Sequence, residues 1–533
     1  MNFQRKGEPT LKKQIAIFDT TLRDGSQAET ISYSLQDKLH IVRALDEFGV
    51  TYIEAGNPAS NPKDLHFFEM LKETPPKHAK LCAFGSTVHP FTPADKDKNL
   101  QSLLAAETPA VAVVGKASAA HVTEILQIDK AENLRMVRDT VATLKANGRE
   151  VIFDAEHFFD GFRDDADYAL SVLSAASEAG ADVLCLCDTN GGTLPDELKA
   201  ATAAVKAEFP HVTLGIHCHN DSGCAAAATL SAVDAGVTHV QGTFLGLGER
   251  CGNAALTTVI GNLTFKYNCD CGVKLGDMKR VAGEIAEISN IRMQRSMPYV
   301  GKCAFAHKGG MHVDAVMKMP SSFEHIEPSL VGNERRFLLS EVAGRGTVLP
   351  RLHKFAPELT KQSPETAAIV EEVKQREYAG YQYEGADASF ELLVKRHLGK
   401  WKPHFNVIMY KLSEDFPAPD GERQSTAVIK IEVDGKTQTA GAMGIGPLHA
   451  LDTAMREALT AFYPEIGELR MSDYKVRVIE TNKATDATTR VLMETTDGAK
   501  NVFVTIGVST DVVEASFMAL VDAFEYALSR HDK

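Results

Sequence analysis

The stretch Ile15-Ala16-Ile17-Phe18-Asp19-Thr20-Thr21-Leu22-Arg23-Asp24 bears most directly on the fold class of this chain. Its four apolar residues predict a short buried strand, and a charged segment follows at once. The same order, an apolar run and then polar residues, recurs along the first half of the chain. Charged residues at the carboxyl ends of buried strands are typical of parallel α/β enzymes, whose active sites lie at those ends.

Eight apolar runs rich in β-forming residues occur before residue 250, and the segments between them have helical periodicity, as in Leu35 to Phe48. Eight is the number of strands that closes a parallel barrel, with a helix after each strand. The near-continuous hydrophobicity of the runs suits burial on both faces. The predicted strands are 15–18, 50–53, 81–84, 110–114, 151–153, 183–187, 212–216 and 239–244.

An open, doubly wound sheet is the alternative to the barrel, and the polar residues distinguish the two. They follow the carboxyl ends of almost all the runs, at 19–27, Glu54, Lys116, 156–157, 188–189, 217–221 and 246–253. A barrel gathers those ends into one ring, whereas an open sheet spreads them along an edge. The sequence therefore predicts an α/β chain with an N-terminal (β/α)8 TIM barrel over residues 1–265.

Two further regions follow the predicted barrel. Residues 266–400 carry helical signals, including an amphipathic helix from Pro364 to Tyr378, and predict a helical linker subdomain. Residues 401–533 predict an α+β regulatory domain with an internal duplication of strands plus helix, and such paired units commonly dimerise or bind small ligands; a purely structural cap is the alternative. The predicted strands are 405–410, 425–433, 474–480, 488–495 and 501–508, with a glycine-rich turn at 441–446 and helices at 447–462 and 512–529.

Composition narrows the function classes. The 533 residues carry a formal charge of −14, from 57 Lys+Arg against 71 Asp+Glu, which argues against a nucleic-acid partner. No apolar run is long enough to span a bilayer, and the first residues lack the apolar core of a signal peptide. The chain has nine cysteines, an odd number, and their spacing shows no disulfide framework, which predicts a protein of the reducing cytoplasm. We therefore expect a cytoplasmic protein with small-molecule chemistry.

The segment Ile216-His217-Cys218-His219-Asn220-Asp221 places an H-x-H pair at the end of a predicted strand. Because side chains alternate along a strand, His217 and His219 face the same side, and their ring nitrogens can converge on one ion. A mixed His/Asp ligand set favours Mg, Mn, Zn or Co with open positions for substrate. Paired histidines can also serve as hydrogen-bonding core residues or as general bases.

The third ligand is expected from Asp19 to Gln27, after the first strand, which neighbours the seventh and eighth strands in a closed barrel. Two carboxylates that flank Arg23 are too charged for a core. Asp24 could be a surface turn residue paired with Arg23, but the histidine pair opposite favours a metal ligand.

Three long motifs appear in order along the chain. Asp19 to Gln27 matches D-T-T-L-R-D-G-x-Q, His217 to Asp221 matches H-x-H-N-D, and Gly246 to Asn253 matches G-x-G-E-R-x-G-N. They resemble the motifs of the metal-dependent TIM-barrel acyltransferases and lyases that include the 2-isopropylmalate and homocitrate synthases. The resemblance covers nearly the whole chain, and Asp154 to Gly161 and Cys187 to Gly192 look like the pyruvate-using branch of this family.

This resemblance implies a divalent metal ion on Asp24, His217 and His219, with Asn253 as a further ligand or close neighbour. Pyruvate would chelate the ion through its keto and carboxylate oxygens. Arg23 would add a fixed positive group at the oxygen that becomes an alkoxide.

The other implied site residues concern the substrates. Thr189 matches the family position whose hydroxyl holds the carboxylate of the oxo acid, and Gln27 and Glu54 would be polar groups of the same pocket. Glu156 matches an acidic residue near the acetyl group. Each of these residues could alternatively be a strand-end cap.

Carbon–carbon bond formation requires a base that removes a proton from the methyl group of acetyl-CoA. The segment 304–312 resembles a family segment that reaches over a site, often that of the partner subunit. His312 is therefore the candidate for a base or water activator, and Glu156 is its competitor. Two departures from the family pattern concern the pocket: Phe323 stands where Tyr is common, and residues 116–119 lack the usual aromatic residue.

Weaker signals are the paired cysteines and the glycine-rich turn. Cys185-Leu186-Cys187 and Cys269-Asp270-Cys271 suggest zinc at first sight, but buried thiols are the favoured interpretation without a second matching pair. The turn at 441–446 resembles that of the regulatory domain of these synthases, which implies isoleucine as the feedback ligand. The same resemblance implies a homodimer.

The resemblance implies a Claisen-type condensation of acetyl-CoA with pyruvate, followed by thioester hydrolysis to (R)-citramalate and CoA, in isoleucine biosynthesis. One alternative keeps this chemistry with a larger oxo acid, 2-oxoisovalerate or 2-oxoglutarate. A lyase at the same metal is another alternative, disfavoured by the C-terminal domain, and a ligand-sensing scaffold is the non-catalytic one.

Overall fold

The computed structural model describes residues 12–60, 62–338, 345–415, 424–479, 486–499 and 501–530. These residues form two compact units, which are described separately. The first comprises the chain up to Phe305 together with Ile326–Arg335, and the second comprises Ala306–His325 and the chain from Arg336 onward.

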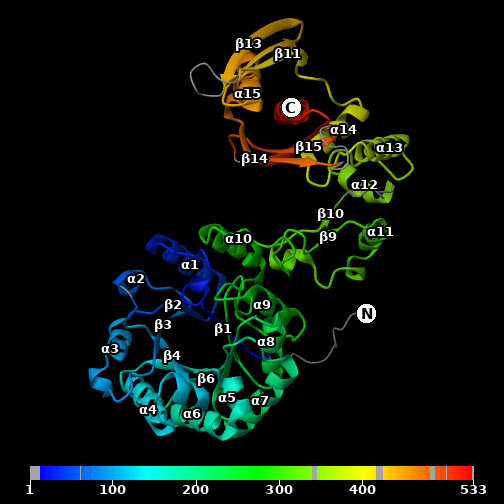
Figure 1. Ribbon diagram of the computed structural model, residues 1–533. Coiled ribbons are helices and arrows are strands. Elements are labelled where there is room, and N and C mark those ends of the chain that lie inside the picture. The colour runs from blue at the N-terminus through cyan, green and yellow to red at the C-terminus, as the bar shows by residue number, and fades with distance from the viewer. Residues whose placement is uncertain are drawn as a thin grey trace. The chain divides into compact units, whose positions relative to one another are not determined.

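In the described part of the first unit, eight parallel strands form a closed barrel, and β1 pairs with β8 to complete the ring (Figure 1). Each strand overlaps one predicted run, so the predicted TIM barrel is confirmed and the open sheet is wrong. The strands are β1 (Ala16–Asp19), β2 (Tyr52–Gly56), β3 (Lys80–Ser86), β4 (Ala110–Lys116), β5 (Glu150–Glu156), β6 (Val183–Asp188), β7 (Thr213–Cys218) and β8 (His239–Gly242).

Helices surround the barrel. The predicted helix 35–48 is confirmed as α1 (Leu35–Phe48), which begins at a Ser34/Asp37 capping box and ends at Gly49, whose φ of 101° favours glycine. The others are α2 (Pro62–Glu73), α3 (Lys98–Ala105), α4 (Lys130–Ala146), α5 (Phe158–Asp164), α6 (Ala166–Glu178), α7 (Pro195–Glu208), α8 (Ala225–Asp234), α9 (Leu256–Phe265) and α10 (Met278–Ile288).

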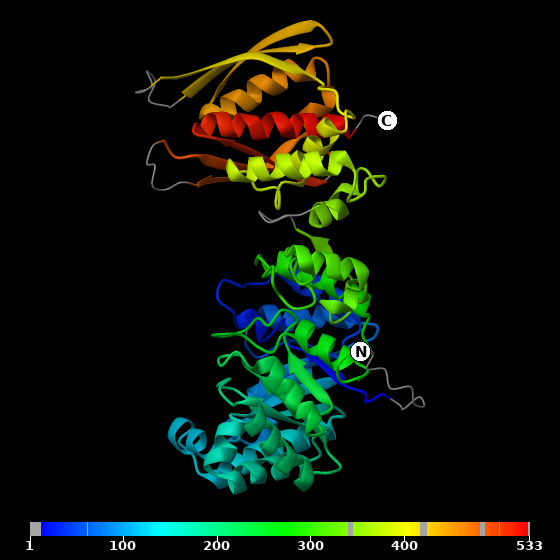
Figure 2. The ribbon, with the colours of Figure 1, turned by 90° about the vertical axis from the view of Figure 1, so that its right-hand side faces the viewer.

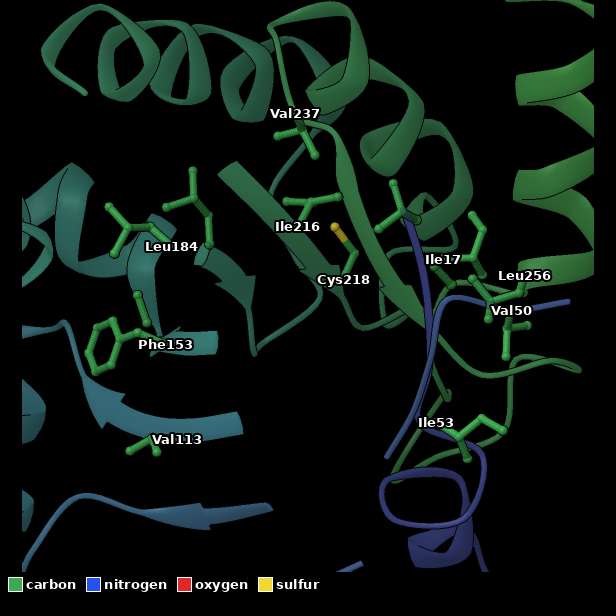
Figure 3. Packing of buried hydrophobic residues seen from close by; sticks show 14 of the residues in the cluster. Ile17, Val50, Ile53, Val113, Phe153, Leu184, Ile216, Cys218, Val237 and Leu256 are labelled. Carbon is green, nitrogen blue, oxygen red and sulfur yellow. The ribbon is translucent and has the colours of Figure 1, made fainter. Parts of the chain in front are cut away.

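The main core lies between the strands and these helices. Figure 3 shows Leu184, Ile216 and Val237 in this layer, where all three are fully buried. Burial of each such side chain contributes roughly 1.5–3 kcal/mol. A smaller cluster, which includes Phe18, Ile152 and Cys185, fills the barrel interior. The barrel is thus a packed scaffold, and its carboxyl end is left to carry polar groups.

Asp46 of α1 ties this helix to the segment that leads into β3. Its buried carboxylate accepts hydrogen bonds from the backbone N–H groups of Lys77, His78 and Ala79 at 2.8–2.9 Å. Burial alone would raise the pKa of Asp46, but these hydrogen bonds lower it. Asp46→Ala is expected to reduce the free energy of unfolding by about 2 kcal/mol at neutral pH, because three backbone donors lose their acceptor.

The pH dependence of this effect has a definite sign. A carboxyl group whose pKa is lower in the folded state stabilises the fold above the unfolded pKa of about 3.9, and that contribution is lost as the pH falls further. Thermal unfolding of Asp46→Ala and of the exposed control Glu47→Ala checks this. Equal midpoints for the two variants at neutral pH would contradict it.

The second unit begins with short elements and helices. They are β9 (Ala306–His307), α11 (Gly310–Lys318), β10 (Arg336–Phe337), α12 (Arg345–Leu352), α13 (Pro364–Tyr378) and α14 (Asp387–His397). The predicted helix 364–378 is confirmed as α13, which has Pro in its first turn, where a missing N–H costs nothing.

The predicted duplication is confirmed in the C-terminal part of the second unit. Two antiparallel sheets each contain three described strands, and a helix packs on each sheet. Figure 2 shows the two helices between the two sheets. The first repeat is β11 (Asn406–Asp415), β12 (Gln424–Val433), β13 (Lys436–Gly444) and α15 (Pro447–Thr460), and the second is β14 (Arg470–Val478), β15 (Thr489–Thr496), β16 (Val502–Ser509) and α16 (Val512–Ser529).

One expectation for this domain is wrong. The glycine-rich segment 441–446 is not simply a turn, because Gly441 to Gly444 belong to β13, which pairs with β12. The glycine at 444 is needed for packing: a Cβ there would lie 2.5 Å from the backbone nitrogen of Ala450 in α15. Glu480, the last residue of one predicted strand, lies outside the described residues.

Candidate active site

Asp24, His217 and His219 meet at the carboxyl end of the barrel. Asp24 follows β1, while the two histidines lie at the end of β7 and just after it. The distances from Oδ2 of Asp24 are 3.2 Å to Nε2 of His217 and 3.7 Å to Nε2 of His219. All three residues are buried, and their ligand atoms lie within 4.8 Å of one another. The structure therefore brings together the three predicted ligands in a group that could hold a metal ion.

A hydrogen-bonded relay fixes the orientation of His217. Gln241 of β8 donates from Nε2 to Oδ1 of Asp154 at 2.9 Å, and its Oε1 lies 3.0 Å from Nδ1 of His217. An ionised Asp154 can only accept, so the amide of Gln241 must direct its carbonyl oxygen at His217. Nδ1 of His217 then carries a proton. Burial alone would lower the pKa of His217, but Asp24 beside its Nε2 raises it, so a metal ion bound here would replace the proton on Nε2.

The charges of these groups are perturbed by burial and by one another. Burial alone would raise the pKa of Asp24, but Arg23 and His217 lower it, so the carboxylate stays charged. Burial and the neighbouring His217 lower the pKa of His219 to about 4, so its imidazole is neutral near pH 7. A charged carboxylate and a neutral imidazole are the forms that bind cations.

Arg23 is held in the site by buried partners. Its Nε donates to Glu54 at 2.7 Å, its Nη1 lies 3.4 Å from Asp24, and its guanidinium stacks 3.9 Å above the ring of Phe84. Burial alone would lower the pKa of Arg23, but Glu54 and Asp24 raise it. Glu54 is fully buried in β2 and also accepts from Thr20, so it positions Arg23 from below.

A cavity of about 240 Å³ opens above these groups. Seven predicted site residues line it: Arg23, Asp24, Gln27, Glu156, Thr189, His217 and His219. The hydroxyl of Thr189 accepts the backbone N–H of His157 at 2.9 Å, which leaves its own proton free to donate to another group. Glu156 is paired with Lys116 at the cavity wall.

Asn253 lies beside the triad, although it does not line this cavity. It forms a bridge with the backbone of His219, and its Nδ2 donates to the carbonyl of Leu247 at 3.0 Å. Its buried Oδ1 has no hydrogen-bond partner among the described residues. The loop before Asn253 needs its glycines: Gly248 has a φ of 154°, and a Cβ there would lie 2.3 Å from Nδ2 of Asn253.

His312 is the one predicted site residue in the second unit. It lies exposed on α11, and its ring stacks on Phe323 with centroids 4.1 Å apart. Phe323 stands where the resembled family commonly has Tyr. The ring at this position therefore contacts the candidate base directly. The catalytic role of His312 stays a prediction.

Several residues of the site were not predicted from the sequence. Asp154 and Gln241 form the relay to His217, while Phe84, Val114, Cys187 and Glu249 line the cavity. Asp154 lies two residues before Glu156 in β5, so strand alternation could have placed both on the inner face. Gln241 sits within a predicted apolar run, where an uncharged amide gives little signal.

Comparison with known proteins identifies the family. Residues 14–285 match the HMGL-like family model, residues 299–379 the model described as homocitrate synthase post-HMGL domain-like, and residues 384–528 the LeuA allosteric (dimerisation) domain. The chain therefore belongs to the HMGL-like family.

Within this family, the similarity extends along nearly the whole chain to proteins named (R)-citramalate synthase. That of Aquifex aeolicus is 46% identical over 98% of this chain and 99% of its own length. That of Synechocystis sp. is 46% identical, with 97% of both chains covered. A probable 2-isopropylmalate synthase of Methanopyrus kandleri is 31% identical over 95% of this chain and 97% of its own length.

Proposed function

We propose that this chain is a citramalate synthase, an acyltransferase that condenses acetyl-CoA with pyruvate and hydrolyses the thioester to give (R)-citramalate and CoA. The observation that carries the proposal is the buried Asp24/His217/His219 group beside Arg23, in a small cavity. Identity of 46% over almost the full length of (R)-citramalate synthases supports the choice of substrate.

The residues present fit a divalent metal ion. Asp24 supplies a charged oxygen, His217 an Nε2 that the Gln241 relay directs at the site, and His219 a neutral ring. The unpartnered Oδ1 of Asn253 is a further oxygen beside His219. When bound there, a divalent ion such as Mg, Mn, Zn or Co supplies Lewis acidity to the keto oxygen of the substrate.

The protein's own groups orient and stabilise the substrate. Arg23 places a fixed positive charge at the oxygen that gains negative charge as the new bond forms. The hydroxyl of Thr189 donates to the carboxylate of pyruvate, and Gln27 is a further polar group of the cavity wall. Glu156 lines this cavity and is the candidate base there for the methyl group of acetyl-CoA, whereas the other candidate, His312, belongs to the second unit.

The cavity has apolar lining residues that can set the size of the bound oxo acid. Its volume is about 240 Å³, and Phe84, Val114 and Cys187 supply its apolar lining. Phe84→Ala is expected to raise the specificity constant for 2-oxobutyrate relative to that for pyruvate by about tenfold, because a pocket distinguishes added methylene groups by their fit. Steady-state kinetics with both oxo acids measure this ratio, and Phe91→Ala, at an exposed phenylalanine, is the control. An unchanged ratio would remove Phe84 from the specificity pocket.

The Gln241 relay predicts an effect on metal affinity. Gln241→Leu removes the group that orients His217, so metal binding is expected to weaken about 10–100-fold. Calorimetric titration with Mn²⁺ measures the affinity directly, without turnover. Gln101→Leu, on the exposed face of α3, is the matched control. If both variants bind Mn²⁺ as the wild type does, the relay does not position His217.

We further propose that the C-terminal domain forms a homodimer and binds isoleucine as a feedback ligand. The match to the LeuA allosteric (dimerisation) domain supports dimerisation and allosteric control, while the choice of isoleucine follows from the family resemblance. Exposed apolar side chains on the two repeats support association: Met443 and Ile445 are 62% and 80% exposed, and Met471 and Val476 are 49% and 46% exposed. None of the helices in the described ranges has the length and apolar character of a membrane span.

A thiol-release assay tests the proposed function. We expect CoA release from acetyl-CoA with pyruvate, little with 2-oxoisovalerate or 2-oxoglutarate, and none after a chelator removes the metal until a divalent ion is added back. Identification of the product as (R)-citramalate completes the test. CoA release only with a larger oxo acid would favour the isopropylmalate or homocitrate alternative.

A further inference from the structure

Asp154, Cys185 and Cys187 form a second cluster of ligand atoms inside the barrel. Asp154 lies on β5 and pairs in register with Cys185 on β6, and strand alternation places Cys187 on the same face as Cys185. The carboxylate oxygen and the two sulfur atoms lie within 4.8 Å of one another. The three residues are only 4%, 0% and 6% exposed.

This cluster differs in chemistry from the Asp24/His217/His219 group. Two thiols with one carboxylate suit thiophilic ions such as Zn²⁺ and Cd²⁺, whereas Mg²⁺ takes oxygen ligands. In a tetrahedral site with metal–sulfur bonds of about 2.3 Å, the ligand atoms lie less than 4.8 Å apart. Small side-chain movements would therefore bring the three ligand atoms into bonding distance of one ion. Asp154 and Cys187 both line the cavity of about 240 Å³, which gives an ion a route of entry.

We propose that Asp154, Cys185 and Cys187 are an inhibitory binding site for thiophilic divalent ions, separate from the catalytic group. Binding exchanges the two thiol protons, which leave to solvent, for two metal–thiolate bonds, and no oxidant is needed. The binding claim stands on the cluster alone, whereas the inhibition claim rests on the proposed function.

Inhibition follows from the position of Asp154 in the relay. Its Oδ1 accepts the hydrogen bond of Gln241 at 2.9 Å, and Gln241 in turn holds His217. An ion on Asp154 competes for that carboxylate and loosens His217. Movement of the Cys187 side chain also changes the wall of the cavity.

Cadmium is the probe for binding. Titration of the full-length protein with Cd²⁺ in excess Mg²⁺ is expected to give an ultraviolet thiolate-to-cadmium charge-transfer band, and the double variant Cys185→Ser/Cys187→Ser is expected to lose it. Cys269→Ser, at another buried cysteine, is the matched control and should keep the band. A full band in the double variant would place the ion on other thiols and overturn the proposal.

X-ray absorption of the Zn²⁺-loaded wild type keeps the proposal testable if the double variant does not fold. Two sulfur ligands at about 2.3 Å are expected, and a shell of nitrogen and oxygen alone would overturn the site.

CoA release tests the inhibition. Cd²⁺ should lower CoA release by the wild type at saturating Mg²⁺. The Cd²⁺ concentration that halves the activity should be at least tenfold higher for Cys187→Ser than for the wild type, each measured against its own activity without Cd²⁺. Equal sensitivity would refute the inhibitory role. Absence of wild-type CoA release would refute the proposed function and leave the spectroscopic test of binding intact.

Discussion

Asp24→Asn is expected to lower the rate of CoA release by about three orders of magnitude or more, with the fold intact. Asn keeps the shape of Asp24 but removes the negative charge that faces His217 and His219. A neutral amide is a poor ligand for a divalent ion, and the stabilisation of the developing alkoxide is lost with the ion. His217→Ala removes a second ligand of the same group and should have a similar effect.

The assay measures thiol release at increasing Mg²⁺ or Mn²⁺, because a weakened site can refill at high metal concentration. Circular dichroism confirms that the variants fold. Asp95→Asn, at an exposed aspartate, is the matched control and should retain wild-type turnover. Wild-type turnover of Asp24→Asn at low metal would show that this carboxylate does not hold the catalytic ion.

Arg23→Gln is expected to reduce kcat by about 10²–10³-fold, because the variant loses the fixed positive charge beside the reacting oxygen. The KM for pyruvate should change less, since this charge matters most in the transition state. Arg23→Lys should recover part of the lost rate, because it restores the charge without the Nε–H group that donates to Glu54. Steady-state kinetics separate the two constants.

A structural cause must be distinguished from a catalytic one in this experiment. Glu54 is fully buried, so removal of Arg23 leaves an unpaired carboxylate, which destabilises the fold. The double variant Arg23→Gln/Glu54→Gln removes both charges and should recover thermal stability without recovering kcat. Recovery of turnover in the double variant would mean that Arg23 serves the fold rather than the reaction.

Much of the fold could be predicted because its signals are local. Each barrel strand is an apolar run, and α13 and α16 carry their own start signals, Pro364 and the capping Asp511. β13 was missed because its alanines and glycines have low strand propensity. That strand forms through its pairing with β12 and its packing under α15, which no local pattern reports.

The triad was predictable for a similar reason: its members follow strands in recognisable motifs, and barrel closure brings strand ends together. Gln241, Asp154 and the cysteine pair were harder to place. Their contacts depend on the register between strands, for example Asp154 against Cys185, and a single sequence does not specify register. The resemblance to a family supplied the ligand set, while the structure supplied the relay behind it.

In the proposed mechanism, one divalent ion binds Asp24, His217 and His219 and presents pyruvate to the acetyl group. Crystals of the full-length protein soaked with Mn²⁺ and pyruvate, measured at the manganese absorption edge, test it most directly. One strong anomalous peak is expected within direct bonding distance of Asp24 Oδ2 and of Nε2 of both histidines, with two pyruvate oxygens on the same ion. A peak elsewhere in the barrel, or pyruvate bound away from the ion, would contradict it.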